Sequence, residues 1–185
     1  MKISADTLIT DLTNRTQLCL SKAAAFNELS AETLNFKRDE LSWSALECLE
    51  HLNLYGRFYL PEIAKRIQRA ESKNKESFKS GWLGNYFANS MLPKEKLNKM
   101  KTFKNMNPLN SRLDKEKVIR EFMQQQEEIL RLLNQARKID LNKTKTNISI
   151  SKWIKLKLGD TFRFVIFHNQ RHLVQAEKVL KGMEN

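Results

Sequence analysis

The chain is poor in the residues that break regular structure or cross-link it. Its 185 residues include only five glycines, three prolines and two cysteines. Because leucine, lysine, glutamate, asparagine and glutamine are abundant instead, the composition favours long helices over a sheet-rich fold. Cys19 and Cys48 do not have the spacing of a paired-cysteine motif, so we expect a reduced, cytoplasmic protein without disulfides.

Long apolar runs are absent as well. No run approaches the roughly 20 residues that a transmembrane helix needs, and residues 1–6 lack the apolar core of a signal peptide. We therefore expect no membrane partner. A hydrophobic content of 41% suffices for a core, and the length suits one domain spanning residues 1–185.

Acidic residues are outnumbered. There are 33 lysines and arginines against 21 aspartates and glutamates, which gives a formal net charge of +12. Such a charge attracts anions, including nucleic acid. The lysines are spread over the chain rather than gathered in one block, however, which is also typical of a solvated surface that only promotes solubility.

Apolar residues recur at steps of three and four in long segments, as in helices with one buried face. We expect helices at residues 4–27, 44–70, 112–137 and 160–181. Ser44 and Glu47 form a capping box at the start of the second helix, and Pro61 should kink or interrupt that helix. Asp160 suits the N-terminal cap of the fourth helix. The predicted fold is all-α, an up-and-down four-helix bundle with a long irregular connection between helices 2 and 3.

The irregular connection runs from Glu71 to Asn110. Connections of this length are often functional, and its aromatic residues argue against simple disorder. We expect it to fold over one end of the bundle. After the third helix, residues 138–149 read as a polar loop, and partial alternation in residues 152–158 indicates an extended segment before the fourth helix.

Histidine is scarce too, and the three that occur are placed at helical positions. His168 and His172 lie four residues apart, so they share the inner face of the fourth helix with Val165 and Ala176. His51 lies two turns into the second helix. A third imidazole from a facing helix would complete a three-nitrogen metal site with open coordination positions. The alternative is that these are hydrogen-bonded core histidines.

Two blocks of sequence carry a resemblance to a known family. Residues 43–52, WSALECLEHL, resemble the second-helix signature of the DinB-like (YfiT-like) superfamily of four-helix-bundle proteins. Residues 158–160, LGD, followed by residues 168–176, HNQRHLVQA, resemble its last-helix signature. The order and separation of the blocks also match, so the resemblance covers nearly the whole chain.

The resemblance implies that His51, His168 and His172 bind one divalent metal, commonly zinc or nickel, with water in the remaining positions. Some members of the superfamily are metal-dependent transferases that use a low-molecular-weight thiol such as bacillithiol or mycothiol, and others have no known activity. A small-molecule substrate or thiol is then the expected partner. A homodimer is a further possible assembly, which the sequence does not decide. The segment from Glu71 to Asn110 matches no particular member.

Three functional hypotheses follow. The first is a metal-dependent thiol transferase or hydrolase, for which the sequence identifies no general base. Glu47 is assigned to the helix cap and Cys48 to packing. The second is a basic nucleic-acid-binding protein that uses the lysines and aromatics of residues 82–104. The third is a non-catalytic metal-holding or interaction protein.

Overall fold

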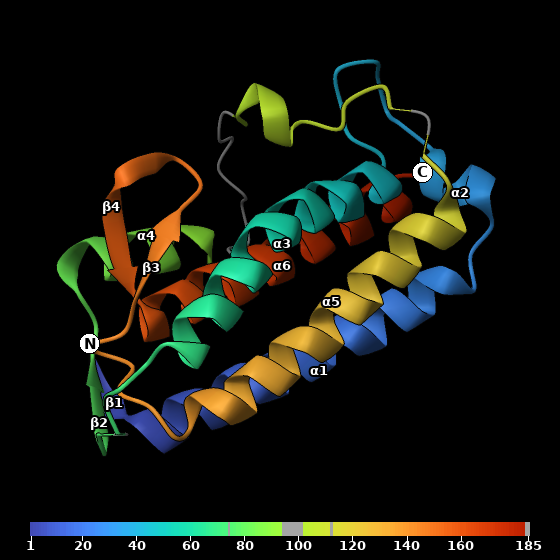
Figure 1. Cartoon of the computed structure of the whole chain (residues 1–185). Helices are drawn as coiled ribbons and strands as arrows, with labels where there is room; N and C mark the ends of the chain where they lie inside the picture. The colour runs from blue at the N-terminus through green and yellow to red at the C-terminus, as the bar shows by residue number, and fades with distance from the viewer. Residues whose placement is uncertain (74, 94–101, 112, 184–185) are drawn as a thin grey trace.

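The computed structural model describes residues 1–73, 75–93, 102–111 and 113–183, and it is mostly helical (Figure 1). The α-helices are α1 (Ala5–Asn27), α2 (Ala31–Asn35), α3 (Ala45–Gln68), α4 (Trp82–Met91), α5 (Lys115–Ala136) and α6 (Leu158–Lys181), with a 3-10 turn η1 (Lys104–Met106). The strands are β1 (Lys2–Ser4), β2 (Ser77–Lys79), β3 (Lys145–Ile148) and β4 (Ser151–Lys157). None of the described helices is long and apolar enough to cross a membrane.

The four long helices α1, α3, α5 and α6 pack into a bundle, but their directions do not alternate. Asn53 of α3 donates a hydrogen bond to Val118 of α5, and Arg57 of α3 donates one to Glu121 of α5. Residue numbers therefore increase in the same direction along both helices, which means that α3 and α5 are parallel. Figure 1 shows the same, with α1 and α6 running the opposite way. The expected up-and-down order is therefore wrong. The chain returns along the length of the bundle between α3 and α5, which lets the second and third long helices run the same way.

The start of α3 has the N-terminal cap that the sequence predicts, whereas the start of α6 does not. The capping box at Ser44 is present, with both reciprocal bonds to Glu47 formed. Asp160 does not cap α6, which begins earlier, at Leu158; instead its carboxylate is buried. The α3 helix also continues through Pro61 without the expected interruption, and Tyr59 and Ile63 on either side of the proline are buried.

Short strands occur beside the bundle. β1 pairs with β2 and β3 with β4, both antiparallel. The segment that we expected to be extended is β4, whereas α4 and β2 lie inside the connection that we expected to be irregular. In the part of this connection that the structure describes, α4 packs on α6 and η1 contacts α3. Residues 94–101 and Arg112, where we expected the third helix to begin, lie outside the described residues.

A layer of polar side chains lies in the interior between two apolar clusters. One cluster is built on the ends of α3 and α6 that carry Ile63 and Phe162, and the other on the ends that carry Leu49 and Leu173. Asn169 of α6 donates a hydrogen bond to Gln126 of α5 at 3.0 Å in this layer. The histidines of α3 and α6 belong to the same layer as Asn169 and Gln126, so the imidazoles lie among polar side chains between the two apolar clusters.

Candidate metal centre

The structure brings all three histidines together. His51 comes from α3, and His168 and His172 come from consecutive turns of α6. One ring nitrogen from each lies within 4.8 Å of the others, and the Nε2 atoms of His51 and His168 are 3.2 Å apart. Among the described residues, no thiol or carboxylate joins this group. Three imidazole nitrogens that converge on one point match the donor set of a divalent transition metal.

The outer nitrogens of two rings have acceptors. The Nδ1 atom of His51 is 2.6 Å from the main-chain oxygen of Met106, and the Nδ1 atom of His172 is 2.9 Å from Oε1 of Gln175. A carbonyl oxygen only accepts, so each Nδ1 carries the proton and donates it. The Nε2 atoms of His51 and His172 then carry the lone pairs through which an imidazole binds a metal, which is one of the two tautomers that metal-binding histidines use.

Burial keeps the three rings uncharged. It lowers the pKa of His51 to about 4, against the opposing effect of the Met106 contact. Burial is also the main reason that the pKa values of His168 and His172 lie well below the ordinary value, and the positive charge of Arg171 nearby acts in the same direction. Neutral imidazoles are the form that binds metals, so an ion bound by this group would not need to displace protons at neutral pH.

Aromatic rings surround the imidazoles. The indole of Trp43 lies with its centroid 4.7 Å from that of His51, and its Nε1 donates to Asn107. The ring of Tyr55 lies 4.6 Å from that of His168. Burial raises the pKa of Tyr55 to about 12, so its hydroxyl remains a hydrogen-bond donor at neutral pH. These rings exclude water from two sides of the group.

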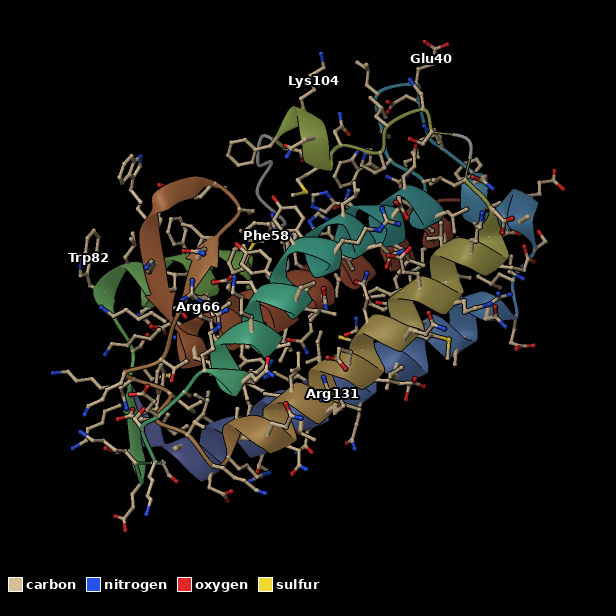
Figure 2. All side chains as sticks on the ribbon, viewed as in Figure 1. Glu40, Phe58, Arg66, Trp82, Lys104 and Arg131 are labelled. Atoms are coloured by element: carbon tan, nitrogen blue, oxygen red, sulfur yellow. The ribbon has the colours of Figure 1, made fainter. Side chains whose placement is uncertain are left out.

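The histidines lie on the wall of a cavity of about 1160 Å³. Tyr55 and Phe164 line it from the bundle, Phe87 from α4, and Phe103 and Asn107 from the segment around η1. Lys104 of η1 points away from the bundle (Figure 2). The site therefore opens into a space large enough for a small molecule, which is roofed by the connection between α3 and α5.

A buried ion pair fixes α4 beside this cavity. The guanidinium of Arg163 donates to Asp160 at 3.1 Å, to Ser80 at 3.0 Å, to Asn85 at 3.2 Å and to Asn89 at 3.0 Å. The α4 helix approaches closely here. A Cβ added at Gly84 would lie 2.4 Å from a carboxylate oxygen of Asp160.

Glu47 binds two segments of the chain to the start of α3. Besides capping α3, its carboxylate accepts from Lys37 at 2.8 Å and from the main-chain amide of Asn110 at 2.6 Å. Asn110 has a φ of 60°, a conformation that asparagine tolerates better than most residues. Cys48 is fully buried in the apolar cluster that contains Leu49 and Leu173, and it is not a member of the histidine group. Glu47 and Cys48 therefore have structural roles, as the sequence indicated.

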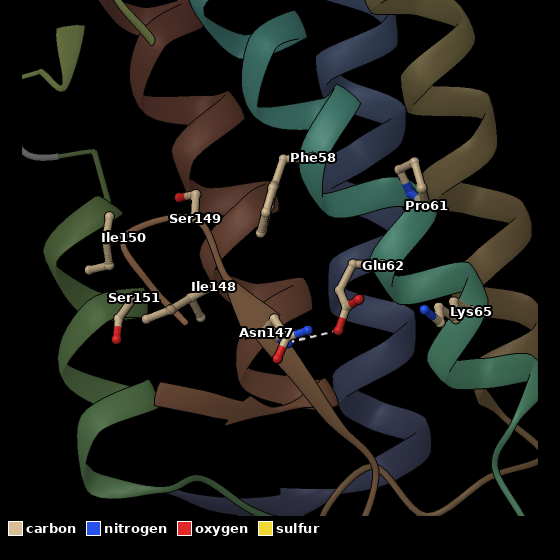
Figure 3. A pocket seen from close by; sticks show the side chains of 9 residues that line it. All are labelled: Phe58, Pro61, Glu62, Lys65, Asn147, Ile148, Ser149, Ile150 and Ser151. Carbon is tan, nitrogen blue, oxygen red and sulfur yellow. Dashed lines mark hydrogen bonds between the residues drawn. The ribbon is translucent and has the colours of Figure 1, made fainter. Parts of the chain in front are cut away.

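A second hollow of about 670 Å³ lies between α3 and the turn of the β3–β4 hairpin (Figure 3). Its one carboxylate, that of Glu62, accepts from the main-chain amide of Asn147 at 2.8 Å and from Arg66 at 2.8 Å. These bonds fasten the hairpin to the bundle. The hollow contains no histidine or cysteine, and we assign it no chemistry.

A comparison of the whole chain with protein families agrees with this arrangement. The family model described as the DinB superfamily matches residues 22–176, most of the chain, including α3 and the two histidines of α6. The chain belongs to the DinB superfamily. No curated protein and no solved structure matches it. In this DinB-superfamily chain, all three histidines chosen from the sequence come together, whereas the contacts that Trp43, Tyr55 and Gln175 make with them are seen only in the fold.

Proposed function

We propose that this DinB-superfamily protein binds one divalent metal ion through His51, His168 and His172, and that it is a metal-dependent transferase or hydrolase acting on a small molecule. The observation that carries this proposal is the convergence of three neutral imidazoles on the wall of a cavity. Zinc and nickel are the metals that the resemblance to the DinB-like superfamily implies, and imidazole ligands suit both, as they suit copper and iron.

The ligand set supports a catalytic role over a purely structural one. Structural zinc sites are closed by four protein ligands, whereas three histidines leave a coordination position for water or substrate. Here the described residues supply three, and the group faces the cavity. A divalent ion bound there would supply a Lewis-acid centre that makes a water or a thiol more acidic.

The residues of the chain define what the cavity would bind. Among the described residues, its charged lining consists of Arg38, Arg171 and Lys178 against one carboxylate, Asp39. This excess of positive charge favours a small anionic substrate or an anionic thiol. Tyr55 would donate a hydrogen bond to a bound molecule, and Trp43 would exclude water from the side of His51. The proposed low-molecular-weight thiol fits both the charge and the volume.

Metal analysis of the purified protein tests the site. Wild-type protein should contain close to one equivalent of zinc or nickel, and His168→Ala should contain none. Glu177→Gln, on the same helix but paired with Lys22 outside the cavity, is the matched control and should keep its metal. Equal metal content in wild type and His168→Ala would show that these histidines are not the ligands.

The activity is tested separately with the metal-loaded protein. Several low-molecular-weight thiols are offered with an electrophile that becomes fluorescent when its carbon–halogen bond is replaced by a carbon–sulfur bond. We expect transfer by wild type and none by His168→Ala. A fully metal-loaded protein that transfers no thiol and hydrolyses no ester or amide would favour a metal-holding role.

A further inference from the structure

The surface formed by α4 and the β3–β4 hairpin carries exposed aromatic rings that the metal centre does not use. Trp82 is 84% exposed and Tyr86 65% exposed on α4, and Trp153 is 94% exposed on β4. Figure 2 shows Trp82 pointing away from the bundle. We call the surface that bears these three rings the aromatic face. Exposed aromatic groups of this kind commonly mark a binding surface, because their contact with water is unfavourable.

The parts of the aromatic face are held together by contacts in the fold. The α4 helix contacts β4, and Tyr86 and Ile150 both line the mouth of the large cavity. The ammonium group of Lys157 on β4 donates at 2.7 Å to the main-chain oxygen of Lys79, three residues before Trp82. The hairpin and α4 thus form one continuous surface.

The charge of this surface is of one sign. Residues 77–93 and 143–159 contain no aspartate or glutamate, and they include six lysines. Lys155 and Lys157 lie on the side of β4 opposite the buried Leu156, because side chains alternate along the paired part of the strand, and Lys155 is exposed as Trp153 is. Lys145 of β3 pairs with Lys157. Lysines are therefore the only charged residues in the two segments that carry the rings, and the complementary partner is anionic.

We propose that the aromatic face docks on the surface of an anionic lipid membrane, with Trp82 and Trp153 inserted at the level of the headgroups. The sequence indicated no membrane partner because it has no spanning segment, but surface docking needs none. Tryptophan and tyrosine are favoured at the boundary between lipid and water, and lysines beside them attract anionic headgroups.

The geometry favours a lipid surface over the other anionic or apolar partners. A second copy of the chain would place lysines against lysines. Single-stranded nucleic acid is bound along basic grooves, whereas neither tryptophan lines either of the two cavities described above. The α4 helix, which bears Trp82 and Tyr86, contains no charged residue. Projecting rings on a short uncharged helix suit a flat boundary.

Cosedimentation of the full-length protein with vesicles tests the proposal. We expect binding to vesicles of phosphatidylcholine mixed with phosphatidylglycerol, and weak or no binding to phosphatidylcholine alone. Trp82→Ala with Trp153→Ala should reduce binding at least about tenfold, and Lys155→Gln should reduce it roughly fivefold. Leu18→Ala, an exposed apolar residue on α1, is the matched control and should bind as wild type.

Folding of the variants is checked by circular dichroism and thermal unfolding, which should not change because the substituted side chains are exposed. The proposal is wrong if wild type does not bind the mixed vesicles, or if the double tryptophan variant binds them as wild type does. It is also wrong if the tryptophan variants lose binding to a single-stranded oligonucleotide, or dissociate a dimer, while wild type ignores vesicles.

Discussion

Replacing Arg163 with methionine should cost the protein a large part of its stability. The side chain of Arg163 is 4% exposed and that of Asp160 1% exposed. Methionine keeps most of the buried volume but removes the four hydrogen bonds to Asp160, Ser80, Asn85 and Asn89. Removing one partner of a buried ion pair typically costs about 3–5 kcal/mol, because the remaining charge is left without compensation. We expect a loss in that range.

The same chain offers a control with the same spacing. Arg131 pairs with Glu128 three residues earlier, as Arg163 does with Asp160, but its side chain is 54% exposed. Figure 2 shows Arg131 on the outside of α5. Exposed pairs contribute little to stability, so Arg131→Met should change the free energy of unfolding far less than Arg163→Met does. Urea unfolding at neutral pH measures both variants against wild type.

The local consequence should appear on α4. Hydrogen exchange of its amides should accelerate in Arg163→Met, because Ser80, Asn85 and Asn89 tie this helix to α6 through that guanidinium. Adding Asp160→Asn to Arg163→Met should recover part of the loss by removing the stranded carboxylate. A loss below about 1 kcal/mol in Arg163→Met, close to that of the surface control, would refute the proposed role of the pair.

Three further results are expected. The pKa of His51 in the folded protein, about 4, lies below its unfolded value of 6.5, so between these pH values the unfolded chain binds more protons and the metal-free protein loses about 3 kcal/mol of stability through this residue as the pH is lowered. The difference in unfolding free energy between wild type and His51→Gln should therefore shrink from pH 7 to pH 4.5, and a constant difference would contradict this. Burial raises the pKa of Cys19 to about 12 and raises that of Cys48 as well, so neither thiol should react with a disulfide reagent until the protein unfolds; rapid modification of native protein would be inconsistent with the structure. Gln175→Ala removes the acceptor of the His172 Nδ1 proton and should weaken metal binding by roughly 10–100-fold in a chelator competition; unchanged affinity would mean that this contact does not orient the ring.

Features that depend on short stretches of sequence could be predicted. The capping box at Ser44 and Glu47 is a local pattern, and the structure has both of its bonds. The pair His168 and His172 follows from the repeat of one helix, and His51 from an equally regular stripe. The DinB-superfamily membership rests on the same blocks of sequence.

Features that depend on distant partners could not be predicted. Asp160 follows Gly159 as a helix cap would, but its environment is set by Ser80 and Gly81, about 80 residues away. The direction of α5 depends on how the connection after α3 runs, and its length permits either direction. Strands as short as β1 and β2 have no pattern of their own, because their register exists only against each other.

The distance along the chain between the histidines has a consequence for biosynthesis. His51 and His168 are separated by 117 positions, although their Nε2 atoms nearly touch. A nascent chain that has emerged only through α5 therefore holds one of the three imidazoles and cannot bind metal as the finished protein does. Contacts this far apart in sequence also form late and slowly during folding. Metal bound at this centre would thus report that α6 has docked against α3, and an ion added during refolding should accelerate no step before that docking.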